Sequence, residues 1–182
     1  TQINFKYGDL IGLIPLFALN ERGYKRIIEL SSLSYLENNN LSEPYLDFNK
    51  LLGENDNKGI CLFTGTINGL FGQLFDKGKF TEIGEMYSKL KSNYNDRFYI
   101  EIQRHGDTNE ISFEKFNLTK SLELEISIIA TNEVFYINKN MHEAHDALIC
   151  IKNKTYVNEK NRIRFSDQHY LKNNSEMSEL FS

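Results

Sequence analysis

The segment RFYIEIQRHG, residues 97–106, decides the fold of this chain. Apolar and polar residues alternate from Phe98 to Gln103, which is the spacing typical of a β-strand with two different faces. His105 follows at the carboxyl end of this expected strand. In parallel α/β sheets and barrels, that end of a strand is where ligands and catalytic groups collect. The segment therefore predicts both a strand and a candidate site residue.

A second expected strand, EISIIA at residues 125–130, is followed in the same way by Asn132 and Glu133. The carboxyl ends of parallel strands meet at one edge of a sheet, so the two polar clusters are candidates to meet in space. For each cluster taken alone, a surface loop is the alternative interpretation.

Short apolar runs alternate with helical stretches along the rest of the chain. Residues 10–19 and 60–63 read as further strands, and Pro15 predicts an edge or a bulge because proline donates no ladder hydrogen bond. Asn20 is expected to cap a helix, and Asp107 with Glu110 resembles a capping box. Helices are expected at 81–91, 107–122, 141–151 and 175–181, and residues 38–59 as mostly loop. This alternation favours an α/β fold with a parallel sheet or barrel.

Composition argues against a free-standing nucleic-acid binder. The 182 residues contain 21 Lys and Arg against 25 Asp and Glu, a formal net charge of −4. Binding to nucleic acid usually needs a basic surface that neutralises phosphates, so we expect weak or no DNA binding by this segment. The densest basic run, residues 152–164, is interpreted as a solvated loop, with a phosphate-contacting patch as the alternative.

Other sequence features place the chain in an ordinary intracellular class. Cys61 and Cys150 lie in apolar contexts, so we expect both to be buried, and no disulfide framework or zinc-ligand spacing is present. No apolar run is long enough to span a membrane and no signal peptide is evident, so no membrane partner is expected and the expected location is cytoplasmic. The chain begins with Thr1 in mid-pattern, which suggests a piece cut from a longer protein.

Two histidines are three residues apart on the helix expected at 141–151. The i and i+3 spacing places His142 and His145 on one helix face, where both could ligate a metal ion. With no third and fourth ligand nearby in sequence, we interpret them as an exposed or capping polar cluster at the helix start. No Walker motif, dinucleotide-binding fingerprint or nucleophile elbow is present.

Several segments, taken together, resemble one family. They are LFALNERGYKRIIELSS (16–32), CLFTGTINGLFGQL (61–74), RFYIEIQRHG (97–106), ATNEVFYINKNMHEAHDALICIKN (130–153) and RFSDQHYLKNNSEMSELF (164–181). In order and spacing they resemble the PHP (polymerase and histidinol phosphatase) domain of bacterial DNA polymerase III alpha subunits. This resemblance implies a distorted seven-stranded (βα) barrel. Residues 1–182 would be a partial domain that lacks the N-terminal strands and leads into the polymerase region.

The resemblance also bears on chemistry. Metal-bearing relatives hold two or three divalent metals at the strand ends and use them to activate water against phosphate esters. The family pattern has His at the position of Leu13, and Asp and His at the positions of Glu133 and Phe135, whereas His105 matches its slot. Leucine and phenylalanine cannot ligate a metal. We therefore expect no catalytic, cofactor or metal site, with His105 and Glu133 as vestigial ligand slots.

The implied function is that of a non-catalytic scaffold within the polymerase subunit. The resemblance implies a docking surface for the separate proofreading exonuclease among the holoenzyme subunits, with Mg²⁺ and DNA bound by the parent protein. The alternative is a residual metal-dependent phosphoesterase or nuclease using His105, Glu133 and the His142–His145 pair. A third interpretation is an unrelated α/β protein. In a complete barrel, Glu101, Gln103 and His105 would line one side of a polar cleft, with Glu133 near His105.

Overall fold

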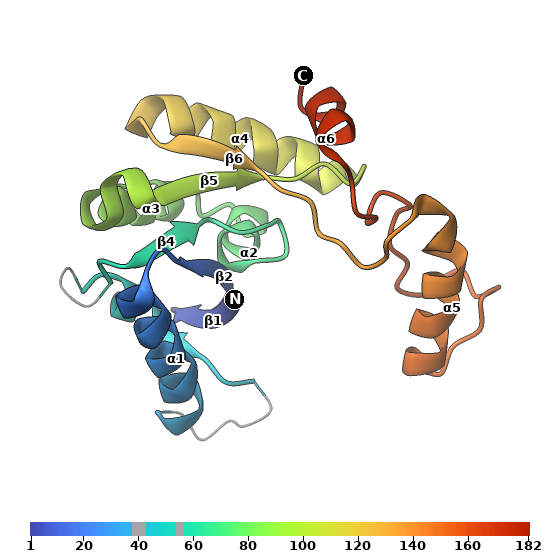
Figure 1. Cartoon of the computed structure of the whole chain (residues 1–182), viewed down its shortest axis with the longest axis horizontal. Coiled ribbons are helices and arrows are strands. Elements are labelled where there is room, and N and C mark those ends of the chain that lie inside the picture. The colour runs from blue at the N-terminus through green and yellow to red at the C-terminus, as the bar shows by residue number, and fades with distance from the viewer. Residues whose placement is uncertain (38–42, 54–56) are drawn as a thin grey trace. The chain divides into compact units, whose positions relative to one another are not determined.

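The computed structural model describes residues 1–37, 43–53 and 57–182 (Figure 1). They form two compact units: unit 1 is Thr1–Ile102 with Phe113–Ile129, and unit 2 is Gln103–Ser112 with Ala130–Ser182. The strands are β1 (Gln2–Tyr7), β2 (Leu10–Ala18), β3 (Leu46–Asp47), β4 (Ile60–Phe63), β5 (Phe98–Ile102) and β6 (Ser127–Ala130). The α-helices are α1 (Glu21–Leu36), α2 (Leu70–Asp76), α3 (Phe80–Tyr94), α4 (Thr108–Leu124), α5 (His142–Asn153) and α6 (Asn174–Leu180).

The six strands form one sheet in the order β3-β1-β2-β4-β5-β6, and this sheet does not close into a barrel within the described residues. The α/β class is confirmed, but the expectation of a parallel sheet is wrong for part of it. Pairs β1–β2 and β2–β4 are antiparallel, whereas β1–β3 and β4–β5 are parallel. The β1–β2 pair is antiparallel because a tight hairpin at Gly8 and Asp9 joins the two strands, and Gly8 has a φ of 59° there. A two-residue turn of this kind joins antiparallel strands only.

Pro15 lies inside the sheet and not on an edge strand, which corrects the expectation of an edge. Leu16 donates its backbone N–H to Thr1 of the β1 side, so the nitrogen of Pro15 faces the β4 side. Pairing between β2 and β4 starts at Leu16 and does not include Pro15. The missing N–H of the proline therefore costs the sheet no ladder bond.

The predicted cap of α1 is confirmed, and a glycine pair sets the entry of this helix. The Asn20 side chain accepts a hydrogen bond from the Gly23 N–H at 3.0 Å. A Cβ added to Gly23 would lie 1.8 Å from the carbonyl oxygen of Gly59, in the turn before β4. Only glycine at this position lets the first turn of α1 approach the sheet so closely.

Unit 1 holds the aliphatic core. Its fully buried side chains include Phe5, Leu16, Leu62, Tyr87 and Phe98, drawn from strands β1, β2, β4 and β5 and from α3. Cys61 is buried, as expected. Helices α1 and α2 both pack against β2. The central position of β2 in these contacts explains why its sequence, LIGLIPLFA, is almost wholly apolar.

Most elements expected from the sequence are confirmed, with shifts of a few residues at their ends. Strand β1 was not foreseen. The predicted loop at 38–59 contains the short strand β3 and a 3₁₀ turn at Phe48–Leu51, while positions 38–42 and 54–56 lie outside the described residues. One of the two hydrogen bonds of the predicted capping box is present: the Asp107 N–H donates to the Glu110 carboxylate at 3.3 Å.

Unit 2 combines helices α5 and α6 with loops that pair locally. Tyr136 and Tyr170 form an isolated parallel bridge, and the Tyr136 hydroxyl donates to the Ser166 carbonyl at 2.9 Å. Asp146 of α5 and Arg162 form a buried two-point ion pair, and this guanidinium holds the pKa of the Asp146 carboxyl below its usual range. Cys150 is buried on the same helix, as expected. Within the described ranges, no helix is long and apolar enough to cross a bilayer.

Candidate functional site

His105 is the centre of the candidate site in unit 2. It lies just beyond β5, and its side chain is only 2% exposed. The ring Nδ1 lies 2.8 Å from the Glu110 carboxylate, and the ring Nε2 accepts the Glu133 backbone N–H at 3.2 Å. A carboxylate can only accept, so Nδ1 carries the proton and Nε2 offers its lone pair to the amide. Both ring nitrogens are therefore in use.

Glu110 supports this arrangement from the first turn of α4. Burial of its carboxyl favours the neutral acid, but donors from the His105 ring, the His105 N–H and the Asp107 N–H outweigh that effect. The pKa of Glu110 is consequently held below its ordinary value. The carboxylate stays ionised and fixes the orientation of the His105 ring.

The expected proximity of His105 and Glu133 is confirmed, because one hydrogen bond joins them. The contact uses the Glu133 backbone, and burial raises the pKa of its partly exposed carboxyl. Gln103, also in unit 2, donates to the Thr131 hydroxyl at 2.8 Å. Glu101 belongs to unit 1, where it is buried and donates its backbone N–H to the Thr64 hydroxyl. The cleft proposed to join Glu101 to the other two residues stays a prediction.

Four aromatic rings stack in a column beside this site. His105 stacks on His169 with ring centroids 4.0 Å apart and planes 2° apart. His169 stacks on Phe135 at 4.7 Å, and Phe135 stacks on His145 at 5.2 Å. We call these four residues the ring column. It brings together segments that are distant in the sequence, and all four belong to unit 2.

The metal ions implied by the family resemblance do not fit these residues. Stacked imidazoles direct their in-plane lone pairs side by side, so His105 and His169 cannot converge on one ion. Phe135 fills the place of a ligand with a hydrocarbon ring, and Leu13 likewise supplies no donor. Across residues 1–37, 43–53 and 57–182, no group of three His, Cys, Asp or Glu side chains could hold a metal ion.

His142 and His145 serve different contacts and do not form a joint ligand pair. The His142 Nε2 lies 2.8 Å from the Phe165 carbonyl oxygen, to which it donates. His145 belongs to the ring column. The two histidines do lie at the start of a helix, because α5 begins at His142. Both side chains are half-buried, however, and not exposed.

Sequence reasoning missed His169, which is buried in the segment before α6. Its Nδ1 donates to the Glu133 carbonyl at 3.2 Å. Burial, together with the neighbouring His105, lowers the pKa of His169 to about 4, so its imidazole is neutral at pH 7. The segment that contains it, RFSDQHYLK, carries a family resemblance but no pattern that marks a site residue. No periodicity marks a single histidine in a loop, so proximity in space was the missing information.

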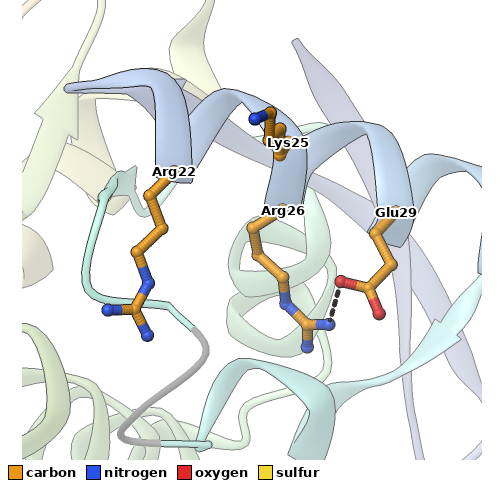
Figure 2. A pocket seen from close by; sticks show the side chains of 4 residues that line it. All are labelled: Arg22, Lys25, Arg26 and Glu29. Atoms are coloured by element: carbon orange, nitrogen blue, oxygen red, sulfur yellow. Dashed lines mark ion pairs between the residues drawn. The ribbon is translucent and has the colours of Figure 1, made fainter.

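A basic pocket of about 280 Å³ lies along α1 in unit 1, and Figure 2 shows its lining side chains Arg22, Lys25, Arg26 and Glu29. Arg26 donates to Asn57 and pairs with Glu29 at 2.9 Å, and Lys25 pairs with Glu21 at 2.7 Å. Carboxylates of the same helix therefore compensate the charges of Lys25 and Arg26.

The basic run at residues 152–164 is largely solvated, as interpreted. Lys152, Lys154, Lys160 and Arg164 are exposed. Arg162 is the exception, because its guanidinium is buried against Asp146 and donates to the Val157 carbonyl. This pairing orders the loop on α5 and removes the central charge of the supposed phosphate patch.

Comparison with known proteins is consistent with the geometry. The PHP domain family matches residues 9–105, more than half of the chain. The chain is 34% identical over 169 residues to the DNA polymerase III subunit alpha of Caulobacter vibrioides, covering 93% of this chain and 15% of that protein. It is 35% identical over 185 residues to the protein of the same name from Rickettsia conorii, covering 99% of this chain and 15% of that protein. The chain thus spans about 15% of the length of these relatives, and it belongs to the PHP domain family.

Proposed function

We propose that this chain is the PHP region of a DNA polymerase III alpha subunit and that it acts as a non-catalytic scaffold. The observation that carries the proposal is the similarity to alpha subunits along nearly the whole chain, from 93% to 99% of its residues. In this proposal the parent protein is a DNA-directed DNA polymerase of the cytoplasm. The parent's polymerase region holds Mg²⁺ and DNA, and this segment holds neither.

The commitment of both His105 nitrogens supports the non-catalytic part of the proposal. A metal-bound hydroxide that attacks a phosphate ester needs several convergent ligands and an open coordination position. Here the Nδ1–H of His105 donates a hydrogen bond to the Glu110 carboxylate, and its Nε2 accepts one from the Glu133 N–H. Phe135 adds a ring where the family pattern has a ligand. These contacts organise the strand ends, and among residues 1–37, 43–53 and 57–182 no three His, Cys, Asp or Glu side chains gather as metal ligands, which supports the proposal.

Phosphate release tests the non-catalytic role against a residual phosphoesterase. The purified chain is incubated with a generic phosphomonoester and a short oligonucleotide, each with added Mn²⁺ or Zn²⁺. The proposal expects no turnover above the rate of a His105→Ala variant. Metal-dependent hydrolysis that this substitution abolishes would overturn it.

We further propose that unit 2 contributes a docking surface for the proofreading exonuclease subunit. Leu148 and Ile151 of α5 are 63% and 73% exposed, and their i and i+3 spacing places them on one helix face. Clustered exposed apolar side chains are typical of protein contact surfaces. Binding of the purified exonuclease subunit from the same organism to this chain, followed by calorimetry, tests the proposal directly.

A further inference from the structure

Unit 2 has no aliphatic core of its own. Every member of the buried hydrophobic cluster, from Ile3 to Ile126, belongs to unit 1. The buried hydrophobic residues of unit 2 are Tyr136 and Cys150, and the remaining buried side chains there are His105, Asp146 and His169. Small units without such a core usually depend on disulfides or bound metals for their stability. Cys150, the cysteine of unit 2, is a free thiol, and the ligand positions described above do not fit a metal ion.

The ring column links four segments of unit 2: the His105 and His169 rings are buried, His145 is half-buried, and Phe135 is 37% exposed. His105, Phe135, His145 and His169 come from four separate segments of unit 2, and the planes of successive rings lie 2°, 19° and 11° apart. Phe165 closes the column from the side, with its ring 4.6 Å from Phe135. Each aromatic contact of this kind stabilises beyond its buried area, so the four segments are joined by consecutive favourable contacts.

Backbone hydrogen bonds couple the column to the surrounding chain. The Glu133 N–H donates to His105, and the His169 ring donates to the Glu133 carbonyl. The Phe135 N–H donates to the His169 carbonyl at 2.9 Å, and the Leu171 N–H donates to the Tyr136 carbonyl at 3.0 Å. Displacing the His105 or the His169 ring therefore breaks a hydrogen bond to the Glu133 backbone.

We propose that the ring column replaces a metal centre as the cross-link that holds unit 2 together. The position that carries a ligand in the family pattern has become a hydrocarbon ring at Phe135, and the histidines beside it contribute ring faces. The proposal concerns the stability of this chain alone and holds whatever the parent protein does.

Hydrogen exchange of individual amides in the full chain tests the proposal. The informative reporters are the amides of Glu133 and Leu171, with Leu19, which donates to Gly59 in unit 1, as an internal reference. Phe135→Leu keeps an apolar side chain but removes the ring, and Phe135→Tyr keeps the ring. The expected result is exchange at least about tenfold faster at both reporters in Phe135→Leu, with Phe135→Tyr close to wild type.

A matched control is Phe181→Leu, the same chemical change in unit 2 outside the column, where the ring faces the Arg104 guanidinium. It should leave the two reporters unchanged. His145→Phe removes ring nitrogens while keeping a stacked ring, so it separates stacking from metal ligation even where Phe135→Leu fails to fold. Protection retained in His145→Phe, and unaltered by added Zn²⁺, supports the proposal. Loss of protection in His145→Phe, or unchanged exchange in Phe135→Leu, would overturn it.

Discussion

The buried neutral His169 makes stability depend on pH in a window that the structure defines. Its pKa is lowered from 6.5 to about 4 by burial and the nearby His105. Between these values the unfolded chain binds a proton that the folded chain does not, so stability falls as the pH falls. The contribution is fully present above about pH 6.5 and is lost progressively down to about pH 4. From about pH 7.5 to about pH 4.5 the loss attributable to this side chain is about 2 kcal/mol.

Urea unfolding of the wild type and of His169→Asn measures this contribution. The asparagine amide can keep the donor to the Glu133 carbonyl, and it does not titrate. Loss of the ring from the column also lowers the stability of the variant at every pH, so the quantity compared is how the unfolding free energy of each protein changes with pH. We expect the wild type to lose about 2 kcal/mol more stability than the variant over that pH range. Parallel pH curves, or a His169 ring signal that titrates near its ordinary value in NMR spectra, would refute the reasoning.

Three further outcomes follow from the same contacts. Tyr87→Phe should destabilise unit 1 by about 1–3 kcal/mol in urea unfolding, because the buried hydroxyl donates to Asn117 at 3.0 Å and the amide oxygen would lose that partner. Replacing Leu148 and Ile151 by serine should weaken exonuclease binding at least about tenfold in calorimetry. The control Leu122→Ser, at an exposed leucine of unit 1, should leave the binding unchanged. With a net charge of −4, the chain should show no submicromolar binding of duplex DNA at about 150 mM salt, as measured by fluorescence anisotropy.

Local patterns were sufficient to predict most elements of the fold. The alternation at residues 98–103 and the apolar runs at 60–63 and 125–130 correspond to β5, β4 and β6. The proximity of His105 and Glu133 was predictable because each follows a strand of the same sheet. The hairpin between β1 and β2 was missed, although Gly8 and Asp9 supply the turn residues that mark one.

The rest of the site depends on contacts between distant segments. His169 stacks on His105 from a loop without periodicity, and the Tyr136–Tyr170 bridge sets that placement. Side-chain direction was equally inaccessible from the sequence, because nothing local shows that the His105 lone pair is taken by a backbone amide. Resemblance identifies Phe135 as a lost ligand, but its place in the ring column depends on residues far away in the sequence.

Metal content tests the central claim most directly, because the account assigns the strand ends of this chain to ring stacking and hydrogen bonds. The chain is purified without a polyhistidine tag, dialysed, and analysed for Zn, Mn and Fe by elemental mass spectrometry. The donor geometry at His105, with Nδ1 on Glu110 and Nε2 on the Glu133 amide, predicts a content far below one metal per chain. A tightly held metal close to one per chain would contradict the account.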